Sequence, residues 1–202
     1  MTIALIDYGA GNLRSAEKAL LAAGAPSVSV TSDAAVVARA SRILLPGVGA
    51  FGACIGALRA LPGMVDALNS AVISDGRPFL GICVGMQLMA GAGEEFGTHA
   101  GLGWIGGTVR RMKPGPAYRI PHMGWNHVTP RAGSLVAPGD VYFTHSFAMQ
   151  DVADADIAGT ADHGGPIIAA VQRANMLGVQ FHPEKSQAHG LDLLARFLAW
   201  KP

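Results

Sequence analysis

Cys83 lies in the run Gly81-Ile82-Cys83-Val84-Gly85, at the end of an apolar stretch that starts at Pro78. Glycines two residues before and two residues after let the backbone turn from a strand into a helix without side-chain clashes, as in the nucleophile elbow of serine hydrolases. The pattern predicts a cysteine whose thiol points out at the end of a strand. The alternative is a cysteine that only fills space, because free cysteine is among the most buried residue types.

The thiol is a useful nucleophile only as the thiolate, so something must lower its pKa. An ordinary cysteine, with a pKa of about 8.5, is ionised to only a few per cent at neutral pH. A helix that begins just after Cys83 would stabilise the anion through its dipole. Lowering the pKa by about two units takes roughly 2.7 kcal/mol, which one imidazolium together with the dipole can supply.

His182, followed by Pro183 and Glu184, is the best placed of the seven histidines to be that base. Proline keeps the residue before it out of helical geometry and fixes its own φ, so the tripeptide is predicted to be extended or turn-like. In an extended segment, residues i and i+2 face the same side, and Glu184 can orient the His182 ring. Cys83, His182 and Glu184 then form a nucleophile, a base and an orienting acid. The alternative is a strand end beside a solvated glutamate.

A tetrahedral intermediate also needs hydrogen-bond donors for its oxyanion. The amide of Val84, directly after the cysteine, is the predicted first donor. The run Pro46-Gly47-Val48-Gly49 follows another predicted strand and would lie at the same sheet edge, where open α/β sheets bind ligands. The amide of Val48 or Gly49 is therefore the predicted second donor, with a simple glycine turn as the alternative.

The composition narrows the class of protein. The chain has 202 residues, of which 50% are hydrophobic and 14% are charged, as expected for one compact α/β enzyme domain over residues 1–202. The net charge of +1 gives no reason to expect a nucleic acid or an anionic membrane as partner. With no secretory signal and no long apolar run, a membrane span is not expected and the cytoplasm is the predicted location.

The cysteine count argues against two kinds of site. Cys54 and Cys83 are the only cysteines. They are too few for a disulfide framework and wrongly spaced for zinc, so we expect no metal. No base motif accompanies Cys54, which is interpreted as a buried helix residue.

Alternation of short apolar runs with helical patterns predicts parallel βαβ units in the first half. Strands are expected at 3–7, 28–30, 42–45 and 78–82, and helices at 12–23, 54–61, 64–74 and 86–90. After residue 91 the strand-like runs are 107–112, 125–128, 141–144, 157–160, 167–173 and 176–180, followed by a helix at 191–200. The predicted fold is a central, twisted, mostly parallel sheet with flanking helices, extended by mixed or antiparallel strands of the same sheet.

The Cys83 elbow and the distant His182-Pro183-Glu184 resemble the class I, or triad, glutamine amidotransferases. Further segments make the whole chain similar to the glutaminase subunits of imidazole glycerol phosphate synthases: Asp7-Tyr8-Gly9-Ala10-Gly11-Asn12, Leu44 to Phe51, Pro121 to Asn126, Tyr142 to Phe147, and Gln180 to Ser186. Phe147 stands where the resemblance leads us to expect tyrosine, which removes a hydroxyl but no backbone group.

The resemblance implies hydrolysis of glutamine to glutamate and ammonia, with no cofactor. Cys83 would form a thioester, His182 would move protons and Glu184 would hold its tautomer. Glutamine contacts are implied for Gly49, Gln87 and Glu95, and for the backbone of Thr144, His145 and Ser146. Glu95 suits the ammonium of an amino acid by charge, although Glu94 stands beside it.

A partner is also implied. Pro121, Met123 and Trp125 form an apolar patch in a loop-like segment, which is unusual for exposed surface unless it is a contact site. Local core packing is the alternative. The resemblance places this segment, with Asn12 and Lys185, against a separate (β/α)₈-barrel cyclase in a heterodimer, so that ammonia reaches the cyclase without entering bulk water.

Other functions remain open from the residues alone. The chain could be a glutaminase that serves another synthase, in guanine nucleotide, anthranilate or aminodeoxychorismate synthesis. It could be a cysteine hydrolase or peptidase that works without a partner, or a regulatory subunit whose elbow is only structural. The intact set of Cys83, His182 and Glu184 argues against the last of these.

Overall fold

A nine-stranded sheet runs through the molecule in the computed structural model, which describes residues 2–202. The strand order is β2-β1-β3-β4-β13-β12-β11-β8-β9. The strands from β2 to β13 in this order are parallel, and those from β12 to β9 continue the sheet in antiparallel pairing. Their bounds are β1 Ile3–Ile6, β2 Val28–Thr31, β3 Arg42–Leu45, β4 Phe79–Ile82, β8 His122–Pro130, β9 Gly139–His145, β11 Ile157–Asp162, β12 Pro166–Arg173 and β13 Met176–Val179. The α/β fold and mostly parallel core predicted from the sequence are confirmed.

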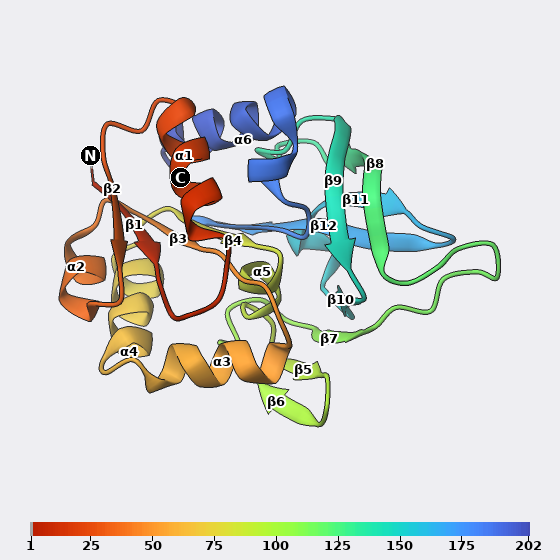
Figure 1. The fold of residues 1–202 in the computed structure, drawn as a ribbon, viewed down its shortest axis with the longest axis horizontal. Helices are drawn as coiled ribbons and strands as arrows, with labels where there is room; N and C mark the ends of the chain where they lie inside the picture. The colour runs from red at the N-terminus through yellow and green to blue at the C-terminus, as the bar shows by residue number, and fades with distance from the viewer. Residues whose placement is uncertain (1) are drawn as a thin grey trace.

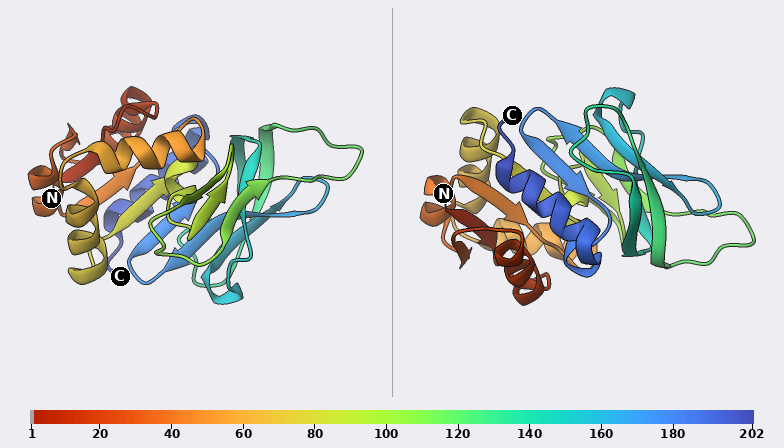
Figure 2. Two further views of the ribbon diagram at one scale, coloured as in Figure 1. Left: turned by 90° about the horizontal axis from the view of Figure 1, so that it is seen from below. Right: turned by 90° about the horizontal axis from the view of Figure 1, so that it is seen from above.

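Helices cover both faces of the parallel half, as Figures 1 and 2 show. Helices α1 and α6 lie on one face, and α3 and α4 lie on the other. Burial of β1, β3 and β4 at all their residues follows from this double cover, and it explains their continuous apolar sequences. The helices are α1 Leu13–Ala22, α2 Ala34–Arg39, α3 Phe51–Ala60, α4 Met64–Leu68, α5 Val84–Gln87 and α6 Gln187–Ala199. A π-helical segment, Asn69–Ser74, continues α4.

A second sheet of four strands corrects one prediction. Its order is β10-β7-β5-β6, and it lies on the side of the main sheet that carries α3 (Figure 2). Residues 107–112 were predicted to extend the main sheet, but β7 belongs to this second sheet. The cause is non-local, because the chain leaves β9 through a corner at Ser146 and re-forms as β10 along β7. The bounds are β5 Ala92–Glu94, β6 Thr98–Ala100, β7 Thr108–Arg111 and β10 Phe147–Gln150.

The strand predicted at 125–128 is confirmed, but β8 is longer and begins at His122, so that Met123, which was predicted to lie in a loop-like segment, also belongs to it. Its buried His122 and Val128 face the core, whereas Met123, Trp125 and His127 are exposed on the other face. This alternation is the period-2 pattern of a half-exposed strand. A glycine at 124 and polar residues on both faces hide that pattern in the sequence.

Three helix starts also differ from the prediction. Helix α3 begins at Phe51 rather than Cys54, because the Glu95 carboxylate accepts a hydrogen bond from the Phe51 amide at 2.8 Å. Helix α6 begins at Gln187, directly after the Pro183–Lys185 3₁₀ turn. Helix α5 begins at Val84 and is only one turn long, so its dipole stabilises a Cys83 thiolate less than a long helix would.

The turn at Cys83 requires both neighbouring glycines for steric reasons. Cys83 itself has φ of +53°, a conformation that costs energy for any residue with a side chain. A Cβ on Gly85 would lie 1.9 Å from the Leu45 carbonyl oxygen, and a Cβ on Gly81 would lie 2.6 Å from the Gly85 carbonyl oxygen. The backbones of β3, β4 and α5 therefore touch directly at the elbow.

Cys54 is buried in α3, as predicted, and Cys54 and Cys83 are both free thiols.

Within residues 2–202, no single helix is long and apolar enough to cross a membrane. Only the pair formed by α3 and Met64–Ser74 has the necessary length and composition, and the two helices of this pair are bent by 94° relative to each other.

Gly85→Ala is expected to destabilise the protein severely. The added methyl group cannot share space with the Leu45 carbonyl oxygen, so the strand or the elbow must move. We expect a loss of about 3 kcal/mol or more, measured as the free energy of unfolding in urea. Gly56→Ala is the matched control, because Gly56 is exposed in α3 and its Cβ would meet no atom within 4 Å. The control should stabilise by about 0.5–1 kcal/mol, and equal effects of the two changes would contradict this explanation of the elbow.

Candidate active site

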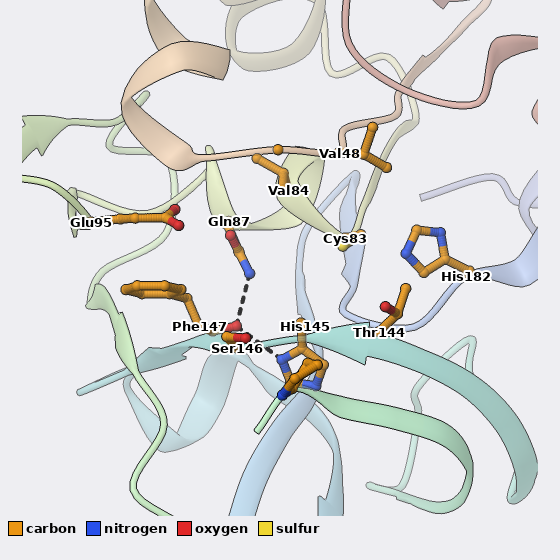
Figure 3. Close-up of a pocket in the computed structure, with 12 residues that line it drawn as sticks. Val48, Cys83, Val84, Gln87, Glu95, Thr144, His145, Ser146, Phe147 and His182 are labelled. Carbon is orange, nitrogen blue, oxygen red and sulfur yellow. Dashed lines mark hydrogen bonds between the residues drawn. The ribbon is translucent and has the colours of Figure 1, made fainter. Parts of the chain in front are cut away.

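A cavity of about 450 Å³ opens at the carboxyl end of the parallel strands, next to Cys83 (Figure 3). The elbow after β4, the loop after β3 and the corner after β9 all contribute to its wall. Every residue predicted to contact substrate lines it, together with the predicted nucleophile and base: Gly49, Cys83, Gln87, Glu95, Thr144, His145, Ser146 and His182. Val48, Val84, Pro121 and Phe147 complete the lining.

Cys83 is only 4% exposed, so its thiol faces the cavity rather than open solvent. The elbow therefore places the thiol at the end of a strand, as predicted, but inside a pocket. The Gln180 side-chain amide donates a hydrogen bond to the Cys83 sulfur at 3.6 Å. A donor directed at the sulfur favours the thiolate over the thiol.

His182 lies beside Cys83 and is held by Glu184, as the sequence predicted. Its Nδ1 is 2.8 Å from Glu184 Oε1, and the two side chains are 2% and 5% exposed. Burial by itself lowers the pKa of His182, but the Cys83 sulfur and the Glu184 carboxylate outweigh it and raise the pKa to about 9. Nε2 has no hydrogen-bond partner, so it is the ring nitrogen that remains for proton transfer. His182 is therefore an imidazolium at neutral pH.

The backbone of His182 is fixed from two sides. Its amide donates to the Tyr142 carbonyl at 2.9 Å, and its carbonyl accepts from the Ser186 hydroxyl at 2.7 Å. The Ser186 oxygen in turn accepts from the Tyr142 amide at 3.0 Å. Ser186 is 1% exposed and was missed as a site residue in the sequence, because nothing local shows that it returns to β9.

The residues predicted to supply the oxyanion donors line the same cavity, but the first donor, the Val84 amide, already makes a hydrogen bond within the protein. The Val84 amide donates to the Gly47 carbonyl at 3.4 Å. Because N–H and C=O of a trans peptide point in opposite directions, the Val48 amide is directed away from Val84. The Tyr8 hydroxyl donates to the Pro46 carbonyl at 2.8 Å, and the Cys54 thiol donates to the Val48 carbonyl at 3.5 Å, so the loop is held on both sides of that peptide.

Glu95 and Glu94 have different surroundings, which separates the two carboxylates. Glu95 lines the cavity, and its position is fixed by the bond to the Phe51 amide at the start of α3. Glu94 is exposed and pairs with Arg110 at 3.1 Å. Only Glu95 therefore offers a negative charge to a molecule in the cavity.

Gln180 is the second site residue that was missed in the sequence. It is fully buried, and its side-chain oxygen accepts from Gln87 Nε2 at 3.0 Å while its amide donates to the Cys83 sulfur. A signal was present, because Gln180 is the one polar residue in the apolar run 176–181. A polar side chain in a buried strand must find hydrogen-bond partners.

The residues predicted to contact a partner fall into three places. Met123 and Trp125 are 61% and 49% exposed on β8, and the Trp125 ring lies 6.1 Å from that of Tyr142. The Lys185 ammonium lies 5.8 Å from the centre of the Tyr142 ring, which makes these side chains one cluster. Pro121 lines the substrate cavity. Asn12 caps α1 through Ser15 and borders a small cleft with His182 and Glu184.

Among residues 2–202, no group of three or more histidine, cysteine, aspartate or glutamate side chains could hold a metal ion. The site brings together the Cys83 sulfur, the His182 ring and the Glu184 carboxylate that binds this ring. This set can attack a carbonyl carbon, form an acyl intermediate and protonate a leaving group.

Comparison with known proteins agrees with this geometry. The family model for "Glutamine amidotransferase class-I" matches residues 4–200. The imidazole glycerol phosphate synthase subunit HisH of Zymomonas mobilis is 53% identical over 100% of this chain and 97% of its own length. The HisH subunit of Caulobacter vibrioides is 52% identical over 100% of this chain and 99% of its own length. The HisH subunit of Rhodospirillum rubrum is 50% identical over the full length of both.

Solved structures share the fold at much lower sequence identity. A glutamine amidotransferase crystal structure superimposes with a TM-score of 0.76 at 17% identity, over 97% of both chains. A structure of PurLQS from Thermotoga maritima superimposes with a TM-score of 0.72 at 18% identity, over 98% of this chain and 97% of the other.

Stability is expected to fall as pH rises through the pKa of His182. The folded-state pKa of about 9 lies above the ordinary value of 6.5. The stabilisation is therefore fully present below pH 6.5 and lost as pH rises through about 9; it is on the order of 3 kcal/mol. Glu184→Gln removes part of it, so the variant's free energy of unfolding should fall less over this range. Glu94→Gln, on the surface, is the control. Parallel pH curves for wild type and Glu184→Gln would contradict the role given to the carboxylate.

Gln180→Leu is expected to slow the reaction of Cys83 with iodoacetamide, because it removes the donor to the sulfur. In a Cys54→Ala background, the rate constant for alkylation at pH 7 should fall about two- to tenfold, as expected for one lost hydrogen bond. Gln180→Glu should slow the reaction further, since it places a negative charge beside the sulfur. An unchanged rate constant in both variants would show that this hydrogen bond does not activate the sulfur.

Proposed function

The chain belongs to the class I glutamine amidotransferase family, and on this basis we propose that it is the glutaminase subunit of an imidazole glycerol phosphate synthase in histidine biosynthesis. One observation carries the proposal: Cys83, a His182 ring bound by Glu184 at 2.8 Å, and the Glu95 carboxylate face one cavity. These are the groups needed to hold an amino acid and cleave its side-chain amide.

Recognition of glutamine uses charge at one end and hydrogen bonds at the other. Glu95 pairs with the α-ammonium group. Both Nε2 hydrogens of Gln87 are used, by the Phe147 carbonyl and by Gln180, each at 3.0 Å, so Gln87 presents its oxygen as an acceptor to the substrate. The backbone of Thr144, His145 and Ser146 contributes further hydrogen-bonding groups along the opposite wall, and Gly49 leaves room beside Cys83.

Acylation begins with the thiolate of Cys83 and the imidazolium of His182. The sulfur attacks the side-chain amide carbon, and a sulfur–carbon bond forms as the carbonyl oxygen becomes an oxyanion. His182 Nε2 then gives its proton to the amide nitrogen, the carbon–nitrogen bond breaks and ammonia leaves. The raised pKa of His182 suits this order, because the acid is already protonated before substrate is cleaved.

Deacylation uses the same groups in reverse. Neutral His182 takes a proton from water, the oxygen attacks the thioester and glutamate leaves as the sulfur becomes a thiolate again. Glu184 holds Nδ1 of the ring throughout, which fixes the tautomer and stabilises the imidazolium. Ser186 and Tyr142 keep the His182 backbone in place during both steps.

Oxyanion stabilisation is proposed to come from the amide of Val84 and from the amide of Val48 or Gly49. The Val84 amide is bound to the Gly47 carbonyl in this structure, so that hydrogen bond must break before the donor can serve an oxyanion. The free chain is therefore expected to hydrolyse glutamine slowly.

The partner is proposed to be a separate (β/α)₈-barrel cyclase that consumes the ammonia to make imidazole glycerol phosphate and AICAR. Full-length identity of about half to subunits of this synthase supports a two-chain enzyme. The exposed Met123 and Trp125, with Lys185 nearby and with Asn12 beside the His182 cleft, are the proposed contact residues. We propose a heterodimer that works in the cytoplasm.

Cys83→Ala is the test of the proposed function. In a complex with the co-purified cyclase and its nucleotide ligand, the variant should lose glutamine-dependent synthesis by a factor of about 10³ or more, as expected for removal of a covalent nucleophile. Synthesis from ammonium salts should remain close to that of wild type. The measurement is product formation from glutamine and, separately, from ammonium chloride.

Cys54→Ala is the matched control, because Cys54 is the other free thiol but does not line the cavity. It loses the hydrogen bond to the Val48 carbonyl but keeps the nucleophile, so its glutamine-dependent synthesis should stay far above that of Cys83→Ala. If Cys83→Ala still used glutamine, the assigned nucleophile would be wrong. Rapid glutamine turnover by the lone chain, unaffected by the cyclase, would favour a hydrolase that works alone.

A further inference from the structure

Three polar side chains and one carbonyl form a continuous row behind the substrate cavity, and the two histidines in it are buried. Asn126 Nδ2 lies 3.1 Å from His122 Nε2, His122 Nδ1 lies 2.9 Å from His145 Nε2, and His145 Nδ1 lies 2.9 Å from the Phe147 carbonyl oxygen. His122 is 3% exposed and His145 is 7% exposed. The row begins on β8 and ends at the corner where the chain leaves β9.

The chemistry of the two ends fixes the direction of every hydrogen bond in the row. A carbonyl oxygen only accepts, so His145 carries its proton on Nδ1. In the neutral ring Nε2 is then an acceptor, and it receives the Nδ1 proton of His122. His122 Nε2 is left as an acceptor for the Asn126 amide, which also donates to the Asp162 carbonyl at 2.7 Å. Both rings are thus neutral Nδ1–H tautomers.

The surroundings of the rings agree with neutral imidazoles. His122 is stacked between Phe143, at 4.5 Å, and His163, at 4.1 Å. Burial and the neighbouring histidines lower the pKa of His122 to about 3. Burial also lowers the pKa of His145, to about 4, against the opposing effect of the Phe147 carbonyl. A proton added to either ring would bring two donors face to face and break the row.

The last member of the row touches the substrate site at two points. The Phe147 carbonyl oxygen also accepts from Gln87 Nε2 at 3.0 Å, as Figure 3 shows. The bond from His145 to Phe147 spans Ser146, so it closes the corner whose backbone faces the cavity. Neither Gln87 nor the Ser146 corner can move without disturbing this carbonyl.

We propose that Asn126, His122 and His145 form a one-directional hydrogen-bond relay that positions the Phe147 carbonyl, and through it Gln87 and the Ser146 corner, for glutamine binding. His122 and Asn126 are positioning residues that do not line the cavity, whereas His145 is both a wall residue and the last link. The relay rests on the proposed function, because glutamine is the molecule that it prepares the pocket to bind. Loss of an upstream link should therefore weaken glutamine binding more than it slows the chemical step.

Two-bond ¹H–¹⁵N correlation spectra of the chain labelled with ¹⁵N-histidine test the relay directly. The His122 and His145 rings should both show the Nδ1–H tautomer, with no titration between about pH 5 and 8, where an ordinary histidine changes charge. An Nε2–H tautomer at either ring, or titration near the ordinary pKa of about 6.5, would overturn the proposal.

Kinetics of the complex with the cyclase test its effect on the pocket. His122→Phe keeps a flat ring between Phe143 and His163 but removes the donor to His145. The KM for glutamine should rise about three- to tenfold, as expected for one lost hydrogen bond, with kcat within about twofold of wild type. His122→Asn restores a donor at the place of Nδ1 and should return KM to within about twofold. His127→Asn, on the outer face of the same strand, is the control and should leave KM unchanged.

The outcomes separate this proposal from the proposed function. If the wild-type complex had no glutamine-dependent activity, the proposed glutaminase function would itself be wrong. An active wild type with an unchanged KM in His122→Phe would overturn the relay alone. So would an equal rise in KM for His122→Asn, because that result would assign the effect to ring packing. If the variants fail to fold, the tautomers of the wild-type rings still decide the proposal.

Discussion

Direct contact between backbones at the elbow is the constraint on which the rest of the site depends. Gly85 lies so close to the Leu45 carbonyl, and Gly81 so close to Gly85, that neither position has room for a methyl group. Cys83, held between them at a positive φ, cannot relax into the strand or into the helix. The sulfur position is thus set by the packing of β3, β4 and the start of α5. The other groups of the site are placed relative to it.

Strand pairing brings those groups to the sulfur. Strands β4 and β13 are parallel and in register, with Ile82 opposite Val179, so the residues that follow both strands emerge at the same edge. The Cys83 amide donates to the Val179 carbonyl at 2.8 Å, which joins the two chain segments one residue before Gln180. His182 then needs only a short turn to reach the thiol, and Ser186 ties that turn to β9. Residues separated by about half of the chain form one site because two neighbouring strands point the same way.

The sequence was sufficient wherever function depends on local geometry. The glycines around Cys83, the proline after His182 and the apolar strands of the parallel core each carry their structural reason in adjacent residues. Gln180 and Ser186 were missed because their partners, Cys83 and Tyr142, are distant in sequence and are reached only after the sheet has formed. Strand β8 was predicted only at 125–128, and its first residues were taken for a loop because glycine and polar residues obscure the alternation. The change of sheet at Ser146 also depends on tertiary contacts. The sequence of β10 does not differ from that of a strand in the main sheet, so its pairing with β7 could not be predicted.

The cavity holds two buried histidines whose surroundings drive their pKa values in opposite directions. Burial disfavours the charged ring at both positions. At His182 a carboxylate and a sulfur, both able to carry negative charge, overcome that cost and raise the pKa to about 9. At His145 the only compensating contact is a neutral carbonyl, and the pKa falls to about 4. These opposite pKa shifts assign the two roles. A ring that is charged at neutral pH can give up a proton, whereas a ring whose charge does not change near neutral pH serves as a fixed donor and acceptor. The same side chain is thus an acid on one wall of the pocket and a rigid support on the other, and the difference comes from the charged or neutral groups that the fold places around each ring.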